Sequence, residues 1–492
     1  MVAGRSFDGR KPSVVAGNSV RNAGSGADFS GVPVDHAIAD RLLDDVLRRV
    51  PARRRRLAPP PPDRDAGAVF GDIGLPHVGR TWQYARWGPA ELLGRYRAEG
   101  PVSLHVVRGE QRVLVAGPEA IEQVLQQQRR DFGQEVSPGD RQVLRRGLGL
   151  LEFDEHRFHR AIMRQVFTVE RLAGYMAAAV VEDAVGQWVP PRQRANRPVP
   201  VFASARELVL ELAFASLLGV DPGRDRDRLA AAVGACAFGS DRTSGGRRAR
   251  VRGRRVLEQY CATLLPRKRR AATDDVFSGL CHARSDEHGV FGDADVLGHL
   301  IFLLVSAMTT TPTALTAVAY YLGKHPDWQE RVRAEADAVG GTPDLDRMPT
   351  LDSVVKESLR LMPPVSWLSR RAVRDTEILG RHVPAGTPVD LAYQVGHLLP
   401  EVWARPEVFD PHRFDTGAPE DRSRRFAWLP FGAGAHRCLG VHVATAQVKA
   451  AVATLVRDYT WEIPETYRIP LRYAPMTTPT DNAPMLLRRR EK

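Results

Sequence analysis

The chain has 492 residues, and 43% of them are apolar, which is enough for a deep core and excludes a disordered chain. The formal net charge is +12, from 70 basic and 58 acidic residues. Apart from short arginine runs, acidic residues are interleaved with the basic ones, whereas a nucleic-acid interface concentrates basic residues on one face. We therefore expect no nucleic-acid partner, and we assign the excess charge to the docking of a small acidic protein.

Four cysteines occur without a CxxC pair or a zinc-ligand spacing, which excludes a secreted disulfide framework. The first 30 residues contain no apolar stretch typical of a signal peptide. Both observations favour a reducing, cytoplasmic location. The segment Val296–Gly323 lacks charged residues and is long enough to span a bilayer. Threonines and a proline interrupt it at 309–313, so we expect a buried core helix and no membrane span.

In chain order, residues 1–65 are expected to form an N-terminal extension, partly disordered. Residues 34–50 have helical apolar spacing, and the arginine- and proline-rich segment 51–62 indicates an exposed linker. Residues 66–492 are expected to form one mainly helical domain with small β-sheets at its margin. Within it, β-type runs flank a turn at 108–110, a helix is expected from 118 to 128, helical periodicity dominates from about 155 to 360, and β-type pieces return near 377–388.

The most informative segment, Phe431 to Gly440, reads Phe-Gly-Ala-Gly-Ala-His-Arg-Cys-Leu-Gly. Its two glycines in a short loop permit backbone geometry that is closed to other residues and a close approach to a bound group. Cys438 lies just before a helical pattern at 441–457, where free backbone N–H groups and the helix dipole favour a thiolate. The segment therefore predicts a thiolate-bound metal centre that carries anionic groups.

This segment resembles the haem-binding loop of the cytochrome P450 family at every defining position. The resemblance implies the P450 fold, a mostly helical triangular prism around a buried haem b. It implies that Cys438 is the axial thiolate ligand of the haem iron, which favours O–O cleavage. It also implies that His436 contacts a haem propionate and that Phe431 belongs to the haem-binding residues.

Further motifs follow in the order of the family. Glu357 and Arg360 form a Glu-x-x-Arg motif and share one helix face. In the family their partner is the arginine of a Pro-x-Arg-Phe segment, which here is Arg413. A buried pair needs such a third group to satisfy the guanidinium. The resemblance implies that the three form a structural clamp behind the haem.

Two segments resemble the propionate-binding parts of the family. His156 and Arg160 lie one helical turn apart, so both could reach a carboxylate. The stretch from Leu361 resembles the segment that crosses the pocket and ends on a propionate-binding arginine. Counting from the Glu-x-x-Arg motif favours Arg370 over Arg371 for this role. Two buried propionates require cationic partners of this kind.

The long helix at Val296–Gly323 resembles the one that crosses the distal pocket of the family. Thr310 takes the position of the family's alcohol, and Thr309 stands where an acid is usual. Because O–O cleavage needs two protons on the correct side, the missing acid matters. Pro312 frees the carbonyl of Met308 from its helical hydrogen bond. We hypothesise that Thr309 and Thr310 act through a relay with water held at that carbonyl.

The family resemblance implies a monooxygenase that activates O₂ and oxidises a hydrophobic small molecule, free or tethered to a carrier. The resemblance covers residues 70–487 and includes no electron-transfer domain, so electrons are expected from a separate ferredoxin or flavodoxin with its NAD(P)H reductase. The arginine-rich composition suggests a role in bacterial natural-product or terpenoid and sterol metabolism. The substrate is expected to contact Ala307, Val365, Ser366 and Trp367.

Two other functions remain open at this point. Because Thr309 replaces the acid, the enzyme could be an atypical one that is driven by peroxide or that performs coupling or rearrangement chemistry. Turnover with peroxide and no reductase would favour that interpretation. Alternatively, the chain could be a non-catalytic relative that recruits another enzyme, although the intact haem-binding motif argues against it.

Overall fold

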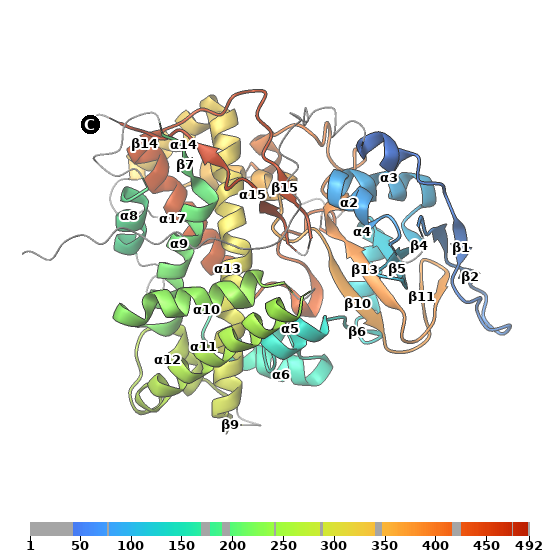
Figure 1. Cartoon of the computed structure of the whole chain (residues 1–492), viewed down its shortest axis with the longest axis horizontal. Coiled ribbons are helices and arrows are strands. Elements are labelled where there is room, and N and C mark those ends of the chain that lie inside the picture. Colours follow the sequence, from blue (N-terminus) through green and yellow to red (C-terminus); the bar gives the residue numbers. More distant parts are fainter. Residues whose placement is uncertain are drawn as a thin grey trace, which may run out of the picture. The chain divides into compact units, whose positions relative to one another are not determined.

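The structure, a computed structural model, describes residues 43–75, 78–168, 178–188, 197–240, 243–285, 289–339, 347–415, 425–474 and 476–490 (Figure 1). The chain divides into two units, Met1–Arg49 and Val50–Lys492. In the first unit, residues 43–48 are helical, and residues 1–42 lie outside the described residues. Most of the predicted extension and most of its predicted helix therefore fall outside them.

The segment 51–62 differs from the exposed linker that its composition indicated. Its arginines form β1 (Arg54–Arg56), which pairs in antiparallel fashion with β3 (Phe70–Asp72). The backbone N–H of Arg53 also donates to the Asp72 carboxylate at 2.8 Å. Backbone pairing explains the difference, because the three arginine side chains remain exposed while their main chain joins a sheet. The contacts divide the chain after Arg49, and the predicted start of the catalytic domain at residue 66 stays a prediction.

The main sheet of the second unit has five strands in the order β4–β5–β13–β10–β6. The predicted hairpin is present as β4 (Val102–Val107) and β5 (Glu110–Ala116), with Val107 paired to Glu110. Its two turn residues, Arg108 and Gly109, both have positive φ, which matches the twist of the two strands. The other strands are β6 (Phe132–Gln134), β10 (Leu368–Ala372) and β13 (Pro388–Ala392). Within this sheet, β5 and β13 pair in parallel and the other neighbouring strands pair in antiparallel fashion.

The remaining described strands form small sheets. A three-stranded sheet contains β11 (Thr376–Ile378), β12 (Arg381–Val383) and β2 (Gly67–Ala68). The two-stranded pairs join β7 (Val199–Pro200) with β17 (Pro484–Met485), β8 (Arg284–Ser285) with β9 (Gly289–Val290), β14 (Tyr459–Thr460) with β18 (Arg488–Arg489), and β15 (Leu471–Arg472) with β16 (Thr478–Pro479).

The centre of the helical part is α13 (Asp293–Lys324), which contains the whole predicted segment Val296–Gly323. It packs against the described helices α9 (Val201–Ala213), α10 (Arg226–Phe238), α11 (Ser244–Arg270), α12 (Val276–His282), α14 (Pro326–Val339), α15 (Pro349–Leu361) and α17 (Val441–Asp458). The other described helices are α2 (Thr81–Trp87), α3 (Pro89–Glu99), α4 (Pro118–Glu122), α5 (Pro138–Val143), α6 (Phe153–Arg164), α8 (Ala178–Gly186) and α16 (Tyr393–Gly396). The helix predicted at 118–128 is α4 followed by a π-helical turn, η1 (Gln123–Gln127).

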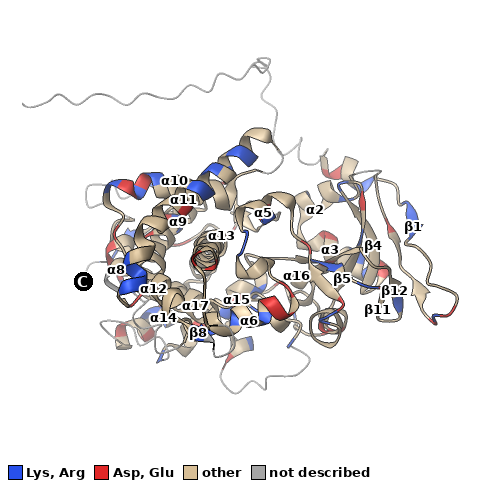
Figure 2. Cartoon of the chain, turned by 90° about the horizontal axis from the view of Figure 1, so that it is seen from below, with Lys and Arg blue, Asp and Glu red and all other residues tan. Residues whose placement is uncertain are grey.

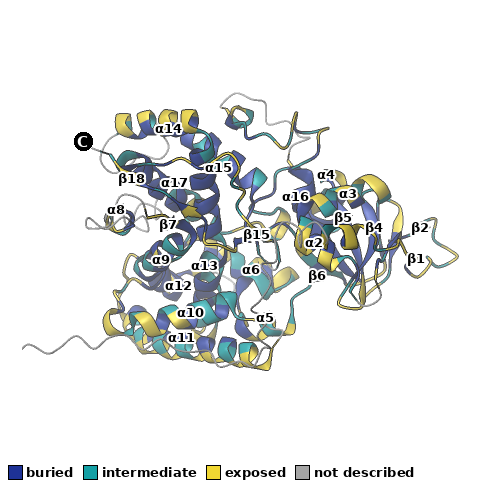
Figure 3. Ribbon diagram, turned by 45° about the horizontal axis from the view of Figure 1, so that its top comes forward, coloured by how far each residue is buried: buried dark blue, intermediate teal, exposed yellow. Residues whose placement is uncertain are grey.

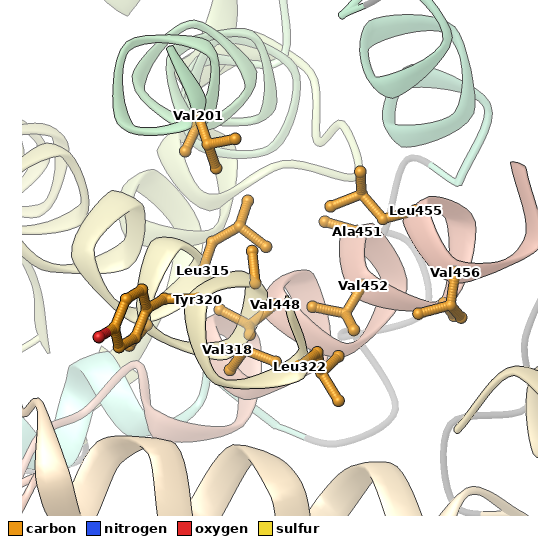
Figure 4. Packing of buried hydrophobic residues seen from close by; sticks show 14 of the residues in the cluster. Val201, Leu315, Val318, Tyr320, Leu322, Val448, Ala451, Val452, Leu455 and Val456 are labelled. Atoms are coloured by element: carbon orange, nitrogen blue, oxygen red, sulfur yellow. The ribbon is translucent and has the colours of Figure 1, made fainter. Parts of the chain in front are cut away.

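A large hydrophobic cluster lies where α13, α17 and α9 meet (Figure 4). Val318 and Leu322 of α13 pack with Val452 of α17, and all three side chains are fully buried. Figure 3 shows α13 and α17 as mostly buried, whereas α14 exposes one side. By length and composition α13 could cross a membrane, but 67% of its most apolar stretch is buried inside the protein. Its place at the centre of the core accounts for that apolar character.

Candidate active site

The loop that carries Cys438 connects the segment at 429 to the start of α17. The Cys438 N–H donates to the carbonyl of Phe431 at 2.9 Å and closes the loop. Gly432 and Gly434 have φ of 65° and 68°, a conformation that other residues rarely adopt. A Cβ on Gly434 would lie 2.5 Å from the carbonyl oxygen of Leu125, so the loop can approach η1 only because the residue is glycine.

Cys438 lies two residues before Gly440, the N-cap of α17, as the sequence predicted. Its side chain is accessible on one side and enclosed by protein on the others. Burial raises the pKa of the thiol, whereas the N–H of Gly440 and the charges of Arg160 and Arg437 favour the thiolate. Arg160 is held in place because its Nη2 donates to the carbonyl of Arg437 at 2.7 Å. The setting therefore supplies the groups that stabilise a sulfur anion once a metal compensates for its burial.

A cluster of cationic and imidazole groups surrounds a small cavity of about 70 Å³ beside this loop. The rings of His156 of α6 and His436 of the loop are in contact, tilted by 32° with centroids 3.8 Å apart, and Arg370 of β10 lines the same cavity. Burial lowers the pKa of His156 to about 4 and that of His436 to about 2, and the charges of Arg160 and Arg370 add to the effect. Arg129 and Arg130 also line the cavity, so three arginines face a single acid, Glu152, among its described lining residues.

The polar atoms of this cluster fit a group with anionic arms. The Nε2 atom of His156 and the Nε atom of Arg160 are buried without a hydrogen-bond partner in the described part of the chain. The one acid that lines the cavity, Glu152, already accepts the N–H of Gln134 at 2.6 Å. Unpaired buried donors are costly, so carboxylates of a bound group would satisfy them. Haem b carries two propionates, and its iron can take a cysteine thiolate as a ligand. The cationic residues of this cluster and the neighbouring Cys438 therefore fit haem b.

Arg370 and Arg371 are neighbours on β10, and their side chains lie on opposite faces of the strand. Arg370 is 4% exposed and points into the cavity beside His156, where its Nη1 also donates to Gln134 at 3.1 Å. Arg371 points to the other face of β10, because side chains alternate along a strand. Its Nε donates to Glu135 at 2.6 Å. The role of Arg370 as a propionate partner stays a prediction.

The three residues of the predicted clamp are in contact. Arg360 donates from Nε and Nη2 to both oxygens of Glu357, each at 2.7 Å, and both side chains are completely buried. The remaining donors of Arg360 reach backbone carbonyls between 397 and 408. Arg413, which lies in the 3-10 turn η6 (Pro411–Phe414), approaches Glu357 at 3.4 Å. A buried pair with its hydrogen bonds satisfied in this way ties α15 to the segment that precedes the cysteine loop.

His397 joins the clamp to the cysteine loop, and sequence reasoning missed it. Its Nδ1 lies 3.0 Å from the carbonyl of Arg360, and its Nε2 accepts the N–H of Leu429 at 2.8 Å. Burial lowers its pKa to about 3, so the ring is neutral, with a proton on Nδ1 and a lone pair on Nε2. The pattern Gly-His-Leu that contains it carries no family signature, and only the fold brings it to this position.

The helix α13 continues through Pro312. The hydroxyls of its two candidate relay threonines donate to backbone carbonyls of the same helix. Thr309 donates to the carbonyls of Val305 and Ser306 at 3.1 and 3.0 Å, and Thr310 donates to Ser306 at 3.0 Å. Such bonds to preceding carbonyls bend a helix slightly and leave the oxygen lone pairs as acceptors. The relay role of the two threonines stays a prediction.

The four predicted substrate residues are not all in one place. Ala307 packs against the core cluster around α13, and Val365 is half-buried. The hydroxyl of Ser366 lies 3.0 Å from that of Thr477, and the ring of Trp367 is tilted against that of Tyr84 with centroids 5.1 Å apart. Trp367 thereby lines a different cavity from the one beside Arg370. Contact of these residues with a substrate stays a prediction.

Comparisons with known proteins agree with this geometry. A profile of the cytochrome P450 family matches residues 254–486. A Mycobacterium tuberculosis protein named as cytochrome P450 136 is 34% identical over 91% of this chain and 94% of its own. Cyclooctat-9-en-7-ol 5-monooxygenase of Streptomyces melanosporofaciens is 31% identical over 81% of this chain and 90% of its own. The solved structure of retinoic acid-bound cyanobacterial CYP120A1 superposes with a TM-score of 0.75 at 25% identity, over 85% of this chain and 98% of that one.

The chain belongs to the cytochrome P450 family. Its fold, which these relatives share, contains the cysteine loop, the cluster of cationic and imidazole groups and the buried pair of Glu357 and Arg360. The chain is a P450 monooxygenase with haem b as its cofactor, and the predicted fold class is confirmed. Haem supplies the one-electron and O₂ chemistry. The residues that would hold it are Cys438 through its thiolate and His156, Arg160, Arg370 and His436 at the propionates, and these roles stay predictions. The carbonyl of Phe431 accepts the N–H of Cys438 and so fixes the loop.

Proposed function

We propose that this monooxygenase oxidises a hydrophobic small molecule of natural-product or terpenoid metabolism, with electrons from a separate acidic ferredoxin or flavodoxin and its NAD(P)H reductase. The observation that carries the partner is an arginine-lined groove behind the cysteine loop. The groove has a volume of about 720 Å³, and no acidic residue is found among the described residues that line it. Seven arginines line it: Arg129, Arg130, Arg157, Arg160, Arg164, Arg425 and Arg437.

The groove suits electron delivery because it also contains the loop itself. Phe431, Gly432 and Gly434 line it, so a partner seated there would lie against the segment that ends at Cys438. A surface with one sign of charge steers an oppositely charged protein and raises its association rate. Arg157 is only loosely paired, at 3.3 Å from the exposed Asp154, and Arg164 is exposed on α6. Both remain available to an acidic surface.

The docking proposal is tested by the rate at which a ferredoxin reduces the ferric enzyme. We expect Arg164→Glu to slow reduction at low salt and to weaken the dependence of the rate on ionic strength, because steering charges are screened within about 10 Å at 0.1 M salt. The matched control is Arg248→Glu, a charge reversal on the exposed face of α11, where Figure 2 shows a second set of basic residues. Equal slowing by both variants would mean that net charge, and not this groove, governs docking.

The substrate class is tested by a binding spectrum. The relative from Streptomyces carries cyclooctat-9-en-7-ol in its name, which is an apolar ring system with one hydroxyl group. The half-buried Ala307 and Val365 offer apolar surface on the segments predicted to face the haem. We expect terpenoids or steroids, free or carrier-tethered, to shift the ferric haem from low to high spin saturably. A panel that gives no shift, including the tethered compounds, would contradict this substrate class.

The cell compartment is part of the same proposal. Cys236, Cys261 and Cys281 are buried free thiols, and burial raises the pKa of each to about 11 or 12. Unpaired, unreactive thiols fit the reducing cytoplasm in which ferredoxins and flavodoxins work.

Proton delivery by the two threonines is the mechanistic part of the proposal. The Thr310 hydroxyl already donates to Ser306, so its oxygen can accept a hydrogen bond from water on the distal side. Thr310→Ala removes this acceptor, and we expect NAD(P)H consumption to continue while product per electron falls. Full, coupled turnover by Thr310→Ala would refute the relay. Thr313→Ala is the control, because its hydroxyl donates to Thr477 at 2.8 Å within the core.

A second function, peroxide-driven oxidation, is favoured by Thr309. Its hydroxyl donates to two helix carbonyls and cannot store a proton as a carboxylate does. Peroxide brings its own protons and electrons, so such an enzyme would not need the missing acid. Turnover with hydrogen peroxide and no reductase, at a rate above that with the redox partners, would support it. A Thr309→Asp variant that gains partner-driven turnover would support the reductase-driven function instead.

A further inference from the structure

A pair of buried histidines joins α6, which carries two predicted propionate partners, to the central helix α13; the two helices lie beside each other in Figures 1 and 3. The Nδ1 atom of His159 lies 2.8 Å from the Nε2 atom of His299, and the rings meet edge to face with centroids 5.0 Å apart. His159 is 7% exposed and His299 is completely buried. Among the described residues, this is the one side-chain hydrogen bond found between α6 and α13.

The position of α6 matters for haem because His156 and Arg160, the predicted propionate partners, belong to this helix. His159 lies between them in the sequence but lines neither the cavity beside His156 nor the arginine-lined groove. The helix starts at Phe153, whose φ of 46° is rare for a bulky residue, and such a conformation persists only where surrounding contacts hold it. The contact with α13 therefore helps to fix where His156 and Arg160 lie.

The hydrogen bond has a preferred direction, because the Nδ1 atom of His299 is buried without a partner in the described part of the chain. When His299 carries its proton on Nε2 and donates to His159, this Nδ1 is left with an unpaired lone pair only. In the reverse direction the proton of His299 would sit on Nδ1, and a buried N–H without an acceptor is the costlier defect. Phe291 packs against both rings, at centroid distances of 5.0 and 4.9 Å, and its ring offers no such acceptor. His299 is therefore the donor and His159 the acceptor.

The surroundings decide which ring takes up a proton first. Burial lowers the pKa of both rings, that of His299 to about 3. Asp295 of α13 and Glu155 of α6 favour the protonated form of His159, and Arg146, which donates to Asp295 at 2.8 Å, opposes protonation of both rings. As the pH falls, His159 therefore takes up a proton before His299. The other charged or titratable groups described on the neighbouring elements are Asp154, His156, Arg157, Arg160 and Arg164 of α6, Arg145 after α5, Asp293 of α13 and Arg284 of β8.

Protonation of His159 removes the acceptor of this bond. Its Nδ1 then carries a hydrogen that faces the Nε2–H of His299, so two donors oppose each other. If the proton of His299 moves to Nδ1, it finds no acceptor there among the described residues. Both arrangements leave an unpaired donor inside the protein, which favours separation of the two rings.

We propose that His299 is a positioning residue for α6, which it holds through the hydrogen bond to His159, and that protonation of His159 opens this contact and speeds the release of haem. The role goes beyond the monooxygenase function, since neither histidine is among the residues predicted to touch haem or to relay protons. It makes the retention of the cofactor sensitive to pH in the range in which histidine titrates, between about 5 and 7.

The first test measures the transfer of haem from the holoenzyme to an excess of apomyoglobin at about pH 7.5 and about pH 5.5. A histidine that titrates near 6.5 only after the contact has opened raises the opening equilibrium about tenfold between these two pH values. His299→Gln keeps a donor for neutral His159 and an acceptor for protonated His159. We therefore expect the ratio of the release rate at the lower pH to that at the higher pH to be about tenfold smaller in His299→Gln than in the wild type.

His325→Gln is the matched control. His325 is the C-cap of the same helix α13, burial also lowers its pKa, and its ring stacks on Phe409 and not on α6. This variant should keep the wild-type ratio of release rates, because it removes a histidine of similar setting without touching the contact between α6 and α13.

The second test needs no variant. Hydrogen exchange of the wild-type holoenzyme, measured by mass spectrometry and corrected for the intrinsic effect of pH, should be faster along α6 at the lower pH and unchanged in α14. The proposal is overturned if α6 of the wild type exchanges equally at both pH values, if His299→Gln keeps the wild-type ratio of release rates, or if His325→Gln lowers that ratio to the same extent. Because none of these readouts requires turnover, the monooxygenase function is tested separately.

Discussion

The two neighbouring arginines of β10 provide a test of the haem site within a single strand. Arg370 lies beside His156 and His436, with 4% of its surface exposed, and we assign it to a propionate. Arg371 lies on the opposite face, bonded to Glu135, with 39% of its side chain exposed. The perturbation is the pair of single substitutions Arg370→Met and Arg371→Met, which remove the same charge and keep similar length.

The expected difference follows from what each guanidinium contacts. Arg370→Met removes a buried charge-assisted hydrogen bond to the cofactor, worth about 1.5–3 kcal/mol, so haem should bind roughly 10- to 150-fold more weakly. Arg371→Met removes a partly exposed ion pair, worth about 1 kcal/mol or less of folding free energy, and should change haem affinity by less than about twofold.

Affinity is measured by titrating the apoprotein with haemin and by following the haem absorbance band. Unfolding by urea, measured on the same apoproteins, shows whether either variant is destabilised. Equal loss of haem affinity in both variants would refute the assignment of Arg370, and so would wild-type affinity in Arg370→Met. A larger loss in Arg371→Met would reverse the assignment.

Three further predictions concern the parts that hold the loop. Glu357→Ala should lower the free energy of unfolding by about 3–5 kcal/mol, because it leaves the fully buried Arg360 without its counterion. Urea unfolding would measure this free energy. The control is Lys356→Ala, which removes the partly exposed ion pair of Lys356 with Asp352 on the same helix and should change the free energy of unfolding by about 0.5 kcal/mol or less. Burial lowers the pKa of His397 to about 3, so as the pH falls the unfolded chain takes up this proton before the folded protein does. The free energy of unfolding should therefore decrease as the pH falls below about 6.5, by at most about 1.4 kcal/mol per pH unit. His397→Asn, which keeps a donor and an acceptor, should flatten this pH dependence, and an unchanged slope would contradict the assignment. Gly434→Ala should reduce haem incorporation, because the added Cβ would meet the Leu125 carbonyl. Gly440→Ala is the control and should incorporate haem normally, because no atom lies within 4 Å of a Cβ at Gly440 and its φ is −86°. Equal yields of holoenzyme from the two variants would contradict the close approach at Gly434.

Much of the site could be predicted because its chemistry requires rare residue patterns at fixed spacing. The loop around Cys438 needs glycine at positive φ at Gly432 and Gly434, and both are found there. The clamp needs Glu357 and Arg360 one turn apart on one helix face, and they form the expected pair. In each case the local sequence determines the geometry, so the prediction did not depend on how distant segments pack.

The sequence was less informative where tertiary packing decides. His397 lies in an ordinary-looking segment, and its two hydrogen bonds join residues 37 and 32 positions away. Trp367 belongs to the expected pocket segment, and the tertiary contact of its ring with that of Tyr84, beside a different cavity from that of Arg370, is not visible in the local sequence. The arginines of β1 read as a linker because their side chains are exposed, and the strand pairing that fixes their backbone leaves no mark in composition.

The central claim is that Cys438 is the thiolate ligand of haem, and its most direct test is an absorbance spectrum. The purified holoprotein would be reduced and exposed to carbon monoxide, alongside Cys438→Ser and the control Cys281→Ser, a buried thiol elsewhere in the fold. The account predicts the thiolate-type spectrum of the family for the wild type and for Cys281→Ser, and its loss in Cys438→Ser. A thiolate-type spectrum that survives in Cys438→Ser would contradict the account.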